Sequence, residues 1–384
     1  MLCVEIQFML LFYKTGRLRV VISTANLVEF DWRDIENTAW VQDVPKREKP
    51  ISHDPRATDF PAVFERVLNA LNVGAGLSSL VRNEFPNLPF PAAHPGALRT
   101  RYDFSRVKAR LIVSIVGKHE SWPSVLGVGH MALMKAVREI GAESKKSNPV
   151  TIECQGSSVG TYSTQWMNEF YGSAEGESPE KWLDEPKSRR AKLPWPRVKI
   201  LFPTLQYVRA SVAGEAGGGT IFCRRKQWEA TKFPRELFYE SRSKRGRILM
   251  HTKMIIATLE KPNIVEADGS ASSSPETSDT ETEPESDDDL VITGDLKGKG
   301  KLKKVYGWAY VGSHNFTPSA WGTLSGSGFS PVLNISNYEI GIVLPLHSAA
   351  EVDKVACFER PPRKYGKGDL PWMQEESAIC QGED

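Results

Sequence analysis

The sequence contains few cysteines and no long apolar run. Its five cysteines lie singly among 384 residues, with no Cys-x-x-Cys pair. This spacing disfavours both a disulfide framework and a zinc site, and we expect a reducing intracellular compartment. The apolar stretch at 8–12 is too short to span a bilayer, so no membrane partner is expected. A composition with 40% hydrophobic and 25% charged residues is typical of a globular chain, here long enough for two domains.

Charge is distributed unevenly along the chain. The formal net charge is +2, but residues 266–295 hold eleven acids and no Lys or Arg, so the rest of the chain carries +13. A surface of that sign attracts a phosphate polymer. The acidic tract has almost no large apolar residues and cannot offset the entropy lost on ordering. We therefore predict a disordered insertion at about 264–303.

Short apolar runs alternate with helical patterns, which is typical of an α/β protein. Runs rich in β-branched residues predict buried strands at 18–23, 109–116, 150–154, 198–202 and 340–344. Asp59 is a suitable N-cap for a helix with one apolar face. A second helix is predicted over 130–139, closed by Gly141.

An internal repeat links the two ends of the chain. Near the start, a predicted strand pair is followed by Asn26 and, six residues later, by Trp32; near the end, another pair is followed by Asn315 and Trp321. The second copy carries the acidic tract inside its strand pair. Such a duplication indicates two similar halves around a pseudo-twofold axis, where equivalent strand ends meet.

The second copy opens with His251, Thr252 and Lys253. On a strand, residues i and i+2 point to the same face, so we expect the imidazole and the ammonium to lie together. An imidazole can transfer a proton near neutral pH, an ammonium offsets charge on phosphoryl oxygens, and Asn315 can add an amide donor. A single His-x-Lys also occurs by chance on many edge strands, so the surrounding motifs decide its meaning.

Short motifs occur in a fixed order along nearly the whole chain. They are Ser-Thr-Ala-Asn-Leu at 23–27 with Asp31 and Trp32, Gly-Ser-Ser-Val-Gly-Thr at 156–161, Leu-Phe-Pro-Thr at 201–204, His-Thr-Lys-Met-Ile-Ile at 251–256, Gly-Ser-His-Asn-Phe-Thr-Pro-Ser-Ala-Trp-Gly at 312–322, Asn-Tyr-Glu-Ile-Gly at 337–341 and Leu-Pro-Trp at 370–372. Together they resemble the tyrosyl-DNA phosphodiesterase family of the phospholipase D superfamily. Each motif is weak alone, but the ordered set is specific.

This resemblance implies a phospholipase D-like α/β fold made of two pseudo-symmetric αβα sandwich halves, an incomplete first half at 1–150 and a second at 151–384. It implies hydrolysis of 3′-phosphotyrosyl and related blocked DNA 3′ ends during DNA repair in the nucleus. In the family one His attacks phosphorus to form a phosphohistidine, and the other protonates the leaving phenolate and then activates water. No cofactor or metal is implied. The implied partners are single- and double-stranded DNA 3′ ends and a DNA-linked tyrosyl peptide such as a topoisomerase I adduct, bound by a monomer.

The resemblance also assigns roles to individual residues. His251 matches the acid, Lys253, Asn315 and Asn26 match phosphate donors, and Glu339 matches a residue that orients the histidine. The expected DNA contacts are Ser157, Ser158, Val159, Gly160, Thr161 and Thr317, through free backbone N–H groups and hydroxyls at a turn. An ordinary capping turn is the alternative for that loop. His314 should face away from the group and be structural.

The first copy of the repeat departs from the family motif. Aligning the strands that start at Met254 and Phe8 places Lys253 on Gln7 and His251 on Glu5. The nucleophilic His and one Lys are therefore missing, and loss of a nucleophile commonly costs several orders of magnitude in rate. We expect either a truncated or mis-spliced N-terminus or an inactive homologue that binds DNA ends. A phospholipid hydrolase is a third alternative, but no Asp follows shortly after this His-x-Lys.

Basic and aromatic residues are interleaved over 187–199 and 224–247. Such stretches suit a single-stranded DNA end, where phosphates meet cations and bases stack on rings. The alternative is a solvated loop whose aromatic side chains anchor it to the core.

Overall fold

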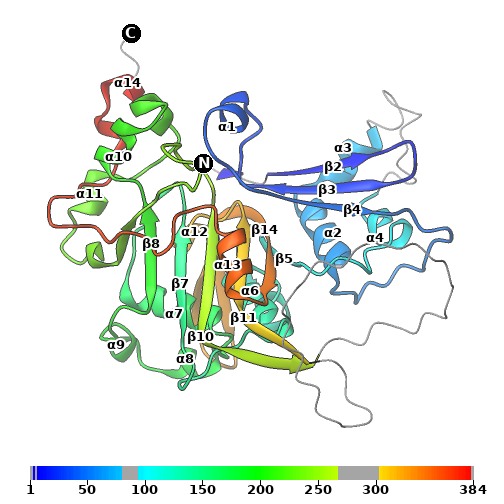
Figure 1. The fold of residues 1–384 in the computed structure, drawn as a ribbon. Coiled ribbons are helices and arrows are strands. Elements are labelled where there is room, and N and C mark those ends of the chain that lie inside the picture. The colour runs from blue at the N-terminus through cyan, green and yellow to red at the C-terminus, as the bar shows by residue number, and fades with distance from the viewer. Residues whose placement is uncertain (1–2, 5–6, 80–93, 267–301, 382–384) are drawn as a thin grey trace.

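The computed structural model describes residues 3–4, 7–79, 94–266 and 302–381. Its largest sheet has the order β1-β14-β11-β10-β7-β8-β9, and β5 also pairs with β14 (Figure 1). The strands are β1 (Cys3–Val4), β5 (Arg110–Ser114), β7 (Val150–Gln155), β8 (Val198–Phe202), β9 (Phe238–Glu240), β10 (Met254–Glu266), β11 (Leu302–Gly312) and β14 (Asn337–Leu346). Parallel pairs join β1 to β14, β7 to β8 and β8 to β9, while the other pairs are antiparallel. The expected mixed α/β class is confirmed.

Both faces of this sheet are buried. In β10, Ile255 belongs to one apolar cluster, and Met254 and Ile256 belong to the other. Because side chains alternate along a strand, an uninterrupted apolar run requires cover on both faces. The first cluster includes residues of α7 (Thr164–Ala174), and the second includes residues of α2 (Phe60–Ala70).

Two smaller antiparallel sheets and a set of mostly short helices complete the described part. One sheet joins β2 (Phe8–Phe12), β3 (Leu18–Ser23) and β4 (Ala39–Val44); the other joins β6 (Gly117–Glu120), β12 (Thr323–Gly326) and β13 (Pro331–Ile335). The remaining helices are α1 (Glu29–Arg33), α3 (Val73–Ser79), α4 (Ala97–Arg101), α5 (Trp122–Val125), α6 (Gly129–Glu139), α8 (Glu180–Asp184), α9 (Lys187–Arg190), α10 (Leu205–Ala210), α11 (Arg225–Trp228), α12 (Pro318–Trp321), α13 (Ala349–Val355) and α14 (Ala378–Gln381). No helix in the described ranges is long and apolar enough to cross a bilayer.

The two predicted helices begin and end for the expected reasons. The Asp59 side chain accepts a hydrogen bond from the backbone N–H of Ala62, which caps α2. After α6, Gly141 adopts a φ of +72°, a conformation that glycine tolerates and that closes a helix. All five predicted strands are present, although the strand predicted at 109–116 is shorter, at Arg110–Ser114.

The range predicted for the disordered insertion includes residues that belong to strands β10 and β11. Strand β10 continues through Glu266 and β11 begins at Leu302, and these two residues pair with each other. The ends of the predicted range at 264–266 and 302–303 therefore belong to a long hairpin, and that part of the prediction is wrong. Residues 267–301 lie outside the described part of the chain.

The division of the chain at residue 150 stays a prediction. Strands β1 and β5 precede that residue, yet both pair with β14 in the large sheet. The first repeat copy, with β2 and β3, lies in the separate small sheet beside it (Figure 1). Strand β3 contacts β11 and β14, which brings the strand ends before Asn26 and Asn315 to the same region.

Candidate active site

His251 and Lys253 lie immediately before β10, in the segment that leads into the main sheet, and not on the strand itself. Both are buried, with 5% and 1% of their surface exposed. The Nζ atom of Lys253 lies 3.0 Å from Nε2 of His251 and donates a hydrogen bond of 3.1 Å to the carbonyl oxygen of Thr24. The structure thus places the imidazole beside the ammonium, and both beside the first copy of the repeat.

Asp31, in α1, is the carboxylate that contacts the imidazole. It is fully buried, and its Oδ2 lies 3.0 Å from Nδ1 of His251 and accepts the backbone N–H of Asn26 at 2.7 Å. Burial alone would raise the pKa of Asp31, but the hydrogen bond and charge of His251, the N–H of Asn26 and the charge of Lys253 hold that pKa below its usual value. A charged Asp31 keeps the ring proton on Nδ1, while Nε2 faces the ammonium of Lys253.

Sequence reasoning missed this role of Asp31. The residue was visible in the motif beside Trp32, but its contact with His251 joins two segments far apart in the chain. The two Trp residues of the repeat also differ. Trp32 is 49% exposed and donates its indole N–H to the carbonyl oxygen of Asn26, whereas Trp321 is fully buried.

Asn26 is oriented by Gln7, which occupies the position expected for the second Lys. The Nε2 of Gln7 donates to Oδ1 of Asn26 at 2.6 Å, so the amide nitrogen of Asn26 is the atom left to donate. Gln7 is 5% exposed, and its own Oε1 is buried without a hydrogen-bond partner in the described residues. The first copy therefore supplies an amide in place of a positive charge. Glu5 lies outside the described residues.

Asn315 is oriented in the same way by the loop after β7. Its Oδ1 accepts the backbone N–H groups of Ser157 and Ser158, at 2.9 and 3.0 Å. The amide nitrogen of Asn315 is again the free donor, as at Asn26. The prediction that the N–H groups of Ser157 and Ser158 are free for a DNA phosphate is wrong, because Asn315 already uses them.

The rest of the predicted DNA-contact loop is mainly structural in its contacts. The Val159 side chain is buried in the core, and its N–H donates to Phe222. Gly160 lies against Thr317, 3.2 Å from where its own side chain would begin, and Thr317 caps α12 by accepting the N–H of Ala320. The Thr161 side chain is exposed. Binding of DNA by Thr161 and Thr317 stays a prediction.

Glu339 and His314 are two further buried residues of the predicted motifs. Glu339 is buried and accepts hydrogen bonds from Ser313 at 2.5 Å and Asn337 at 3.1 Å. Its predicted role in orienting the histidine stays a prediction, since the carboxylate that contacts Nδ1 of His251 is Asp31. His314 bonds to the Tyr310 hydroxyl and lies 3.0 Å from the Ser114 hydroxyl. Burial lowers its pKa well below the usual value, so it is a neutral, structural residue, as expected.

The basic and aromatic stretches contribute less to a DNA surface than predicted. Trp228, Phe233 and Phe238 belong to the apolar core and do not offer open faces for bases. Several of the cations are paired, such as Lys199 with Glu153 at 2.9 Å. The alternative interpretation, a loop anchored by its aromatic side chains, therefore holds for these three rings.

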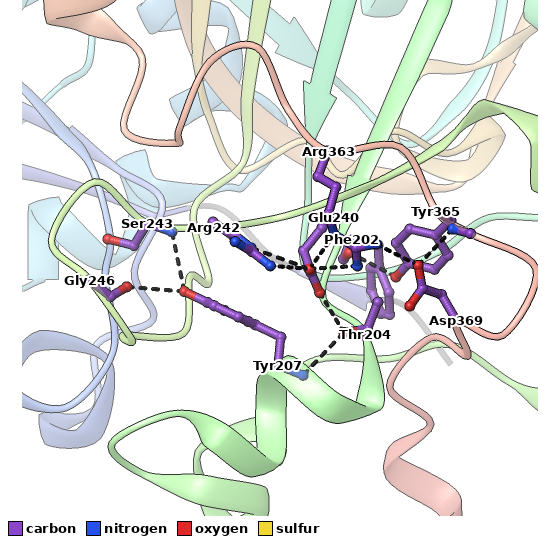
Figure 2. Close-up of polar contacts among 11 residues, drawn as sticks. Phe202, Thr204, Tyr207, Glu240, Arg242, Ser243, Gly246, Arg363, Tyr365 and Asp369 are labelled. Carbon is purple, nitrogen blue, oxygen red and sulfur yellow. Dashed lines mark hydrogen bonds and ion pairs between the residues drawn. The ribbon is translucent and has the colours of Figure 1, made fainter.

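A polar network fastens the C-terminal segment to the ends of β8 and β9 (Figure 2). The buried Glu240 accepts hydrogen bonds from Thr204, from Arg242 at 3.0 Å and from Arg363 at 2.7 Å. Arg363 also pairs with Asp369 at 2.7 Å. The Leu-Phe-Pro-Thr motif at 201–204 thus has a structural role in this network.

The fold and the contacts that bring His251 and Lys253 together with Asp31 and the loop of Asn26 define a phospholipase D-like protein. A family model described as tyrosyl-DNA phosphodiesterase matches residues 6–369. Because this match covers nearly the whole chain, the chain belongs to the tyrosyl-DNA phosphodiesterase family.

Individual relatives agree with this assignment. The chain is 28% identical to tyrosyl-DNA phosphodiesterase 1 of Arabidopsis thaliana over 63% of its length and 38% of the relative, and 25% identical to the Drosophila melanogaster protein of the same name over 96% and 56%. A probable tyrosyl-DNA phosphodiesterase of Caenorhabditis elegans is 27% identical over 54% of this chain and 40% of the relative. The chain therefore spans between 38% and 56% of the length of these relatives.

Solved structures show the same fold. The crystal structure of yeast tyrosyl-DNA phosphodiesterase superposes with a TM-score of 0.55 at 15% identity, covering 96% of this chain and 77% of the yeast chain. Its SCAN1 mutant gives a TM-score of 0.56 at 14% identity, covering 96% and 76%.

Proposed function

We propose that this chain is a phosphodiesterase that removes tyrosyl groups from DNA 3′ ends. The observation that carries the proposal is the contact of one Asp31 oxygen with both the backbone of Asn26 and the ring of His251. This contact joins the two copies of the repeat into one group of donors. The family to which the chain belongs, and the printed names of its relatives, supply the substrate class.

The contacts of each side chain in this group orient it to bind the phosphate or to transfer a proton. A phosphate at this site meets the ammonium of Lys253 and the amide donors of Asn26 and Asn315, which counter charge on the phosphoryl oxygens. Water attacks phosphorus as the P–O bond to the tyrosyl oxygen breaks, the attacking water loses a proton to solvent, and Nε2 of a protonated His251 gives its proton to the leaving phenolate. A phenol, with a pKa of about 10, leaves more readily than an alcohol, so a tyrosyl ester is the favoured substrate.

The proposal extends to slower release of 3′ nucleosides, to DNA binding and repair, and to residence in the nucleus. The nucleoside reaction uses the same donors with a poorer leaving group. Nuclear residence is tested by imaging a fluorescent fusion of the chain, and exclusion of the fusion from the nucleus would remove that part of the proposal.

A second function, binding of DNA ends without turnover, is favoured by Gln7. This residue has no positive charge where the family motif has Lys, and its amide N–H donates to Asn26 instead of facing a phosphate. Glu5 stands where the motif has the nucleophilic His. Both functions predict binding of a blocked 3′ end, and only the first predicts release of tyrosine.

An oligonucleotide with a 3′-phosphotyrosyl end separates the two functions. We expect slow release of tyrosine by the wild type, a loss of about 100-fold or more in His251→Ala, and faster release in the double variant Glu5→His with Gln7→Lys. Circular dichroism checks that each variant is folded. Tight binding with no release by either the wild type or the double variant would establish the binding protein instead, and absence of both binding and release would reject both functions.

A further inference from the structure

A cavity of about 540 Å³ lies between α2, β5 and α6, apart from the residues of the candidate active site. Pockets of this size are in the range of those that hold small organic ligands. Cations predominate among its charged lining residues, which are Arg47, Asp59, Arg66, Arg99, Arg110, Lys135 and Glu139. The cavity is therefore suited to an anion.

The two acids of the cavity are already neutralised. Asp59 pairs with Arg99 at 3.0 Å, and Glu139 pairs with Arg110 at 2.9 Å. Lys135, one turn before Glu139 on α6, lies 3.7 Å from the same carboxylate. These pairs leave the charge of Arg66 to face an incoming ligand.

Arg66 makes no hydrogen bond or ion pair with any residue that the structure describes. Its side chain is exposed at the mouth of the cavity, and the neighbouring atoms lower the pKa of its guanidinium by partial burial. Arg47 pairs with Asp103 at 3.3 Å, while its Nε is buried with no partner. An anion in the cavity would meet the unpaired guanidinium of Arg66 and the Nε of Arg47 that lacks a partner in the described residues.

The apolar lining of the cavity indicates what else the ligand carries. Phe60 and Phe104 line the cavity and stack on each other, with ring centroids 5.8 Å apart, and Val63 and Leu126 add further apolar surface. A nucleotide combines a phosphate, which matches the fork of a guanidinium, with a flat base that packs on aromatic and apolar side chains. The charge of +13 outside the acidic tract also favours a polyanion.

We propose that this cavity binds one nucleotide unit of a nucleic-acid strand, with its phosphate on Arg66 and Arg47 and its base against Phe60. Gly127 lines the cavity, and Gly129, two residues further along the chain, lies so close to the carbonyl oxygen of Trp321 that no side chain would fit there. The inference goes beyond hydrolysis of a 3′ end, because binding here needs no reacting ester.

Fluorescence anisotropy with a labelled single-stranded oligonucleotide that lacks any 3′ adduct tests the proposal. Arg66→Ala should weaken binding on the order of tenfold, the loss expected for one charge-assisted hydrogen bond. It should also make the slope of log affinity against log salt shallower by about 0.7, the value for one phosphate contact on a single strand. Arg66→Lys keeps the charge and should keep most of that slope.

Arg56→Ala is the matched control, because Arg56 is exposed and does not line the cavity. Equal weakening by Arg56→Ala and Arg66→Ala would mean that only overall charge matters, and would overturn the proposal. Binding of an acidic peptide that depends on Arg66, with oligonucleotide binding unchanged in Arg66→Ala, would overturn it in favour of a protein partner.

A small aryl ester of thymidine 3′-phosphate separates this inference from the proposed catalytic function. Its hydrolysis should be the same in Arg66→Ala and in the wild type, because the ester is too small to occupy both sites. If the wild type hydrolyses neither this ester nor the tyrosyl oligonucleotide, yet oligonucleotide binding still depends on Arg66, the catalytic proposal fails and the nucleotide site stands.

Discussion

Asp31 acts on two segments of the chain with a single oxygen. Its Oδ2 accepts the N–H of Asn26 and faces Nδ1 of His251, so the loop after β3 and the ring before β10 cannot move independently. Because the pKa of Asp31 is held below its usual value, the carboxylate stays charged between about pH 5 and pH 9. Whenever the ring of His251 is neutral, this carboxylate favours the tautomer with the proton on Nδ1.

Asp31→Asn should lower kcat about 100-fold or more while changing KM little. An asparagine can turn its N–H toward Nδ1 and so favour the tautomer with the proton on Nε2, which is the wrong atom for accepting a proton. The phosphate donors Lys253 and Asn315 remain, so binding should persist. Steady-state kinetics on the 3′-phosphotyrosyl oligonucleotide measures both constants. Asp34→Asn, which alters a surface pair with Arg33 in the same loop, is the control; a similar loss there would show that the effect is only structural.

The residues of the site could be predicted from the sequence, but the hydrogen bonds that orient them could not. His251, Lys253, Asn26 and Asn315 were identified from spacing and motif, because their chemistry is a property of residue type. The hydrogen bonds that orient the two asparagines come from Gln7 and from the backbone of the loop after β7. Backbone donors leave no trace in residue identity, so the contact of Asn315 with this loop was not predictable.

At the scale of elements, the burial of a strand determines whether it can be predicted from the sequence. Strands β7, β8 and β10 are covered on both faces and therefore appear as continuous apolar runs. Strand β6 is largely exposed, with the sequence Gly-Lys-His-Glu, and nothing in its composition distinguishes it from a loop. The hairpin of β10 and β11 extends into the predicted insertion at 264–266 and 302–303, where its pairing is carried by the backbone.

The network of Glu240 gives a testable pH dependence (Figure 2). Burial would raise the pKa of Glu240, but Thr204, Arg363 and Arg242 lower it below 4.5 in the folded chain. A carboxyl whose folded pKa is depressed stabilises the fold above its unfolded pKa, and this contribution is lost as the pH falls through the folded pKa. Glu240→Gln should therefore cost about 1–2 kcal/mol at pH 7, since both arginines are partly exposed, and much less at pH 3.

Urea unfolding of the wild type and Glu240→Gln at pH 7, 5, 4 and 3 measures this difference. Glu48→Gln is the control, because Glu48 is exposed and forms no hydrogen bond or ion pair in the described structure. A difference between wild type and Glu240→Gln that stays constant down to pH 3 would show that the network does not depend on the charge of Glu240.

At the scale of the whole molecule, the repeat predicts two halves. It does not predict that residues of both halves lie in one shared core. Leu18 and Phe64 from the early part of the chain lie in the same buried cluster as Met254 and Ile340 from the late part. The backbone shows the same sharing, because β5 pairs with β14 along Glu339 to Val343. Periodicity finds strands but does not say which neighbour each one takes, so this sharing was not predictable.

This shared sheet predicts that neither half folds alone. In a fragment of residues 151–384, β14 loses its partner β5 and leaves backbone donors and acceptors on an open edge. Apolar side chains such as Ile340 and Ile342 also lose cover from α2 and β3. We expect this fragment to aggregate and to lack a cooperative thermal transition, and co-expression with residues 1–150 to restore both solubility and the transition. Gel filtration and circular dichroism measure these outcomes, and a monomeric, cooperatively unfolding fragment would instead establish the second half as an autonomous domain.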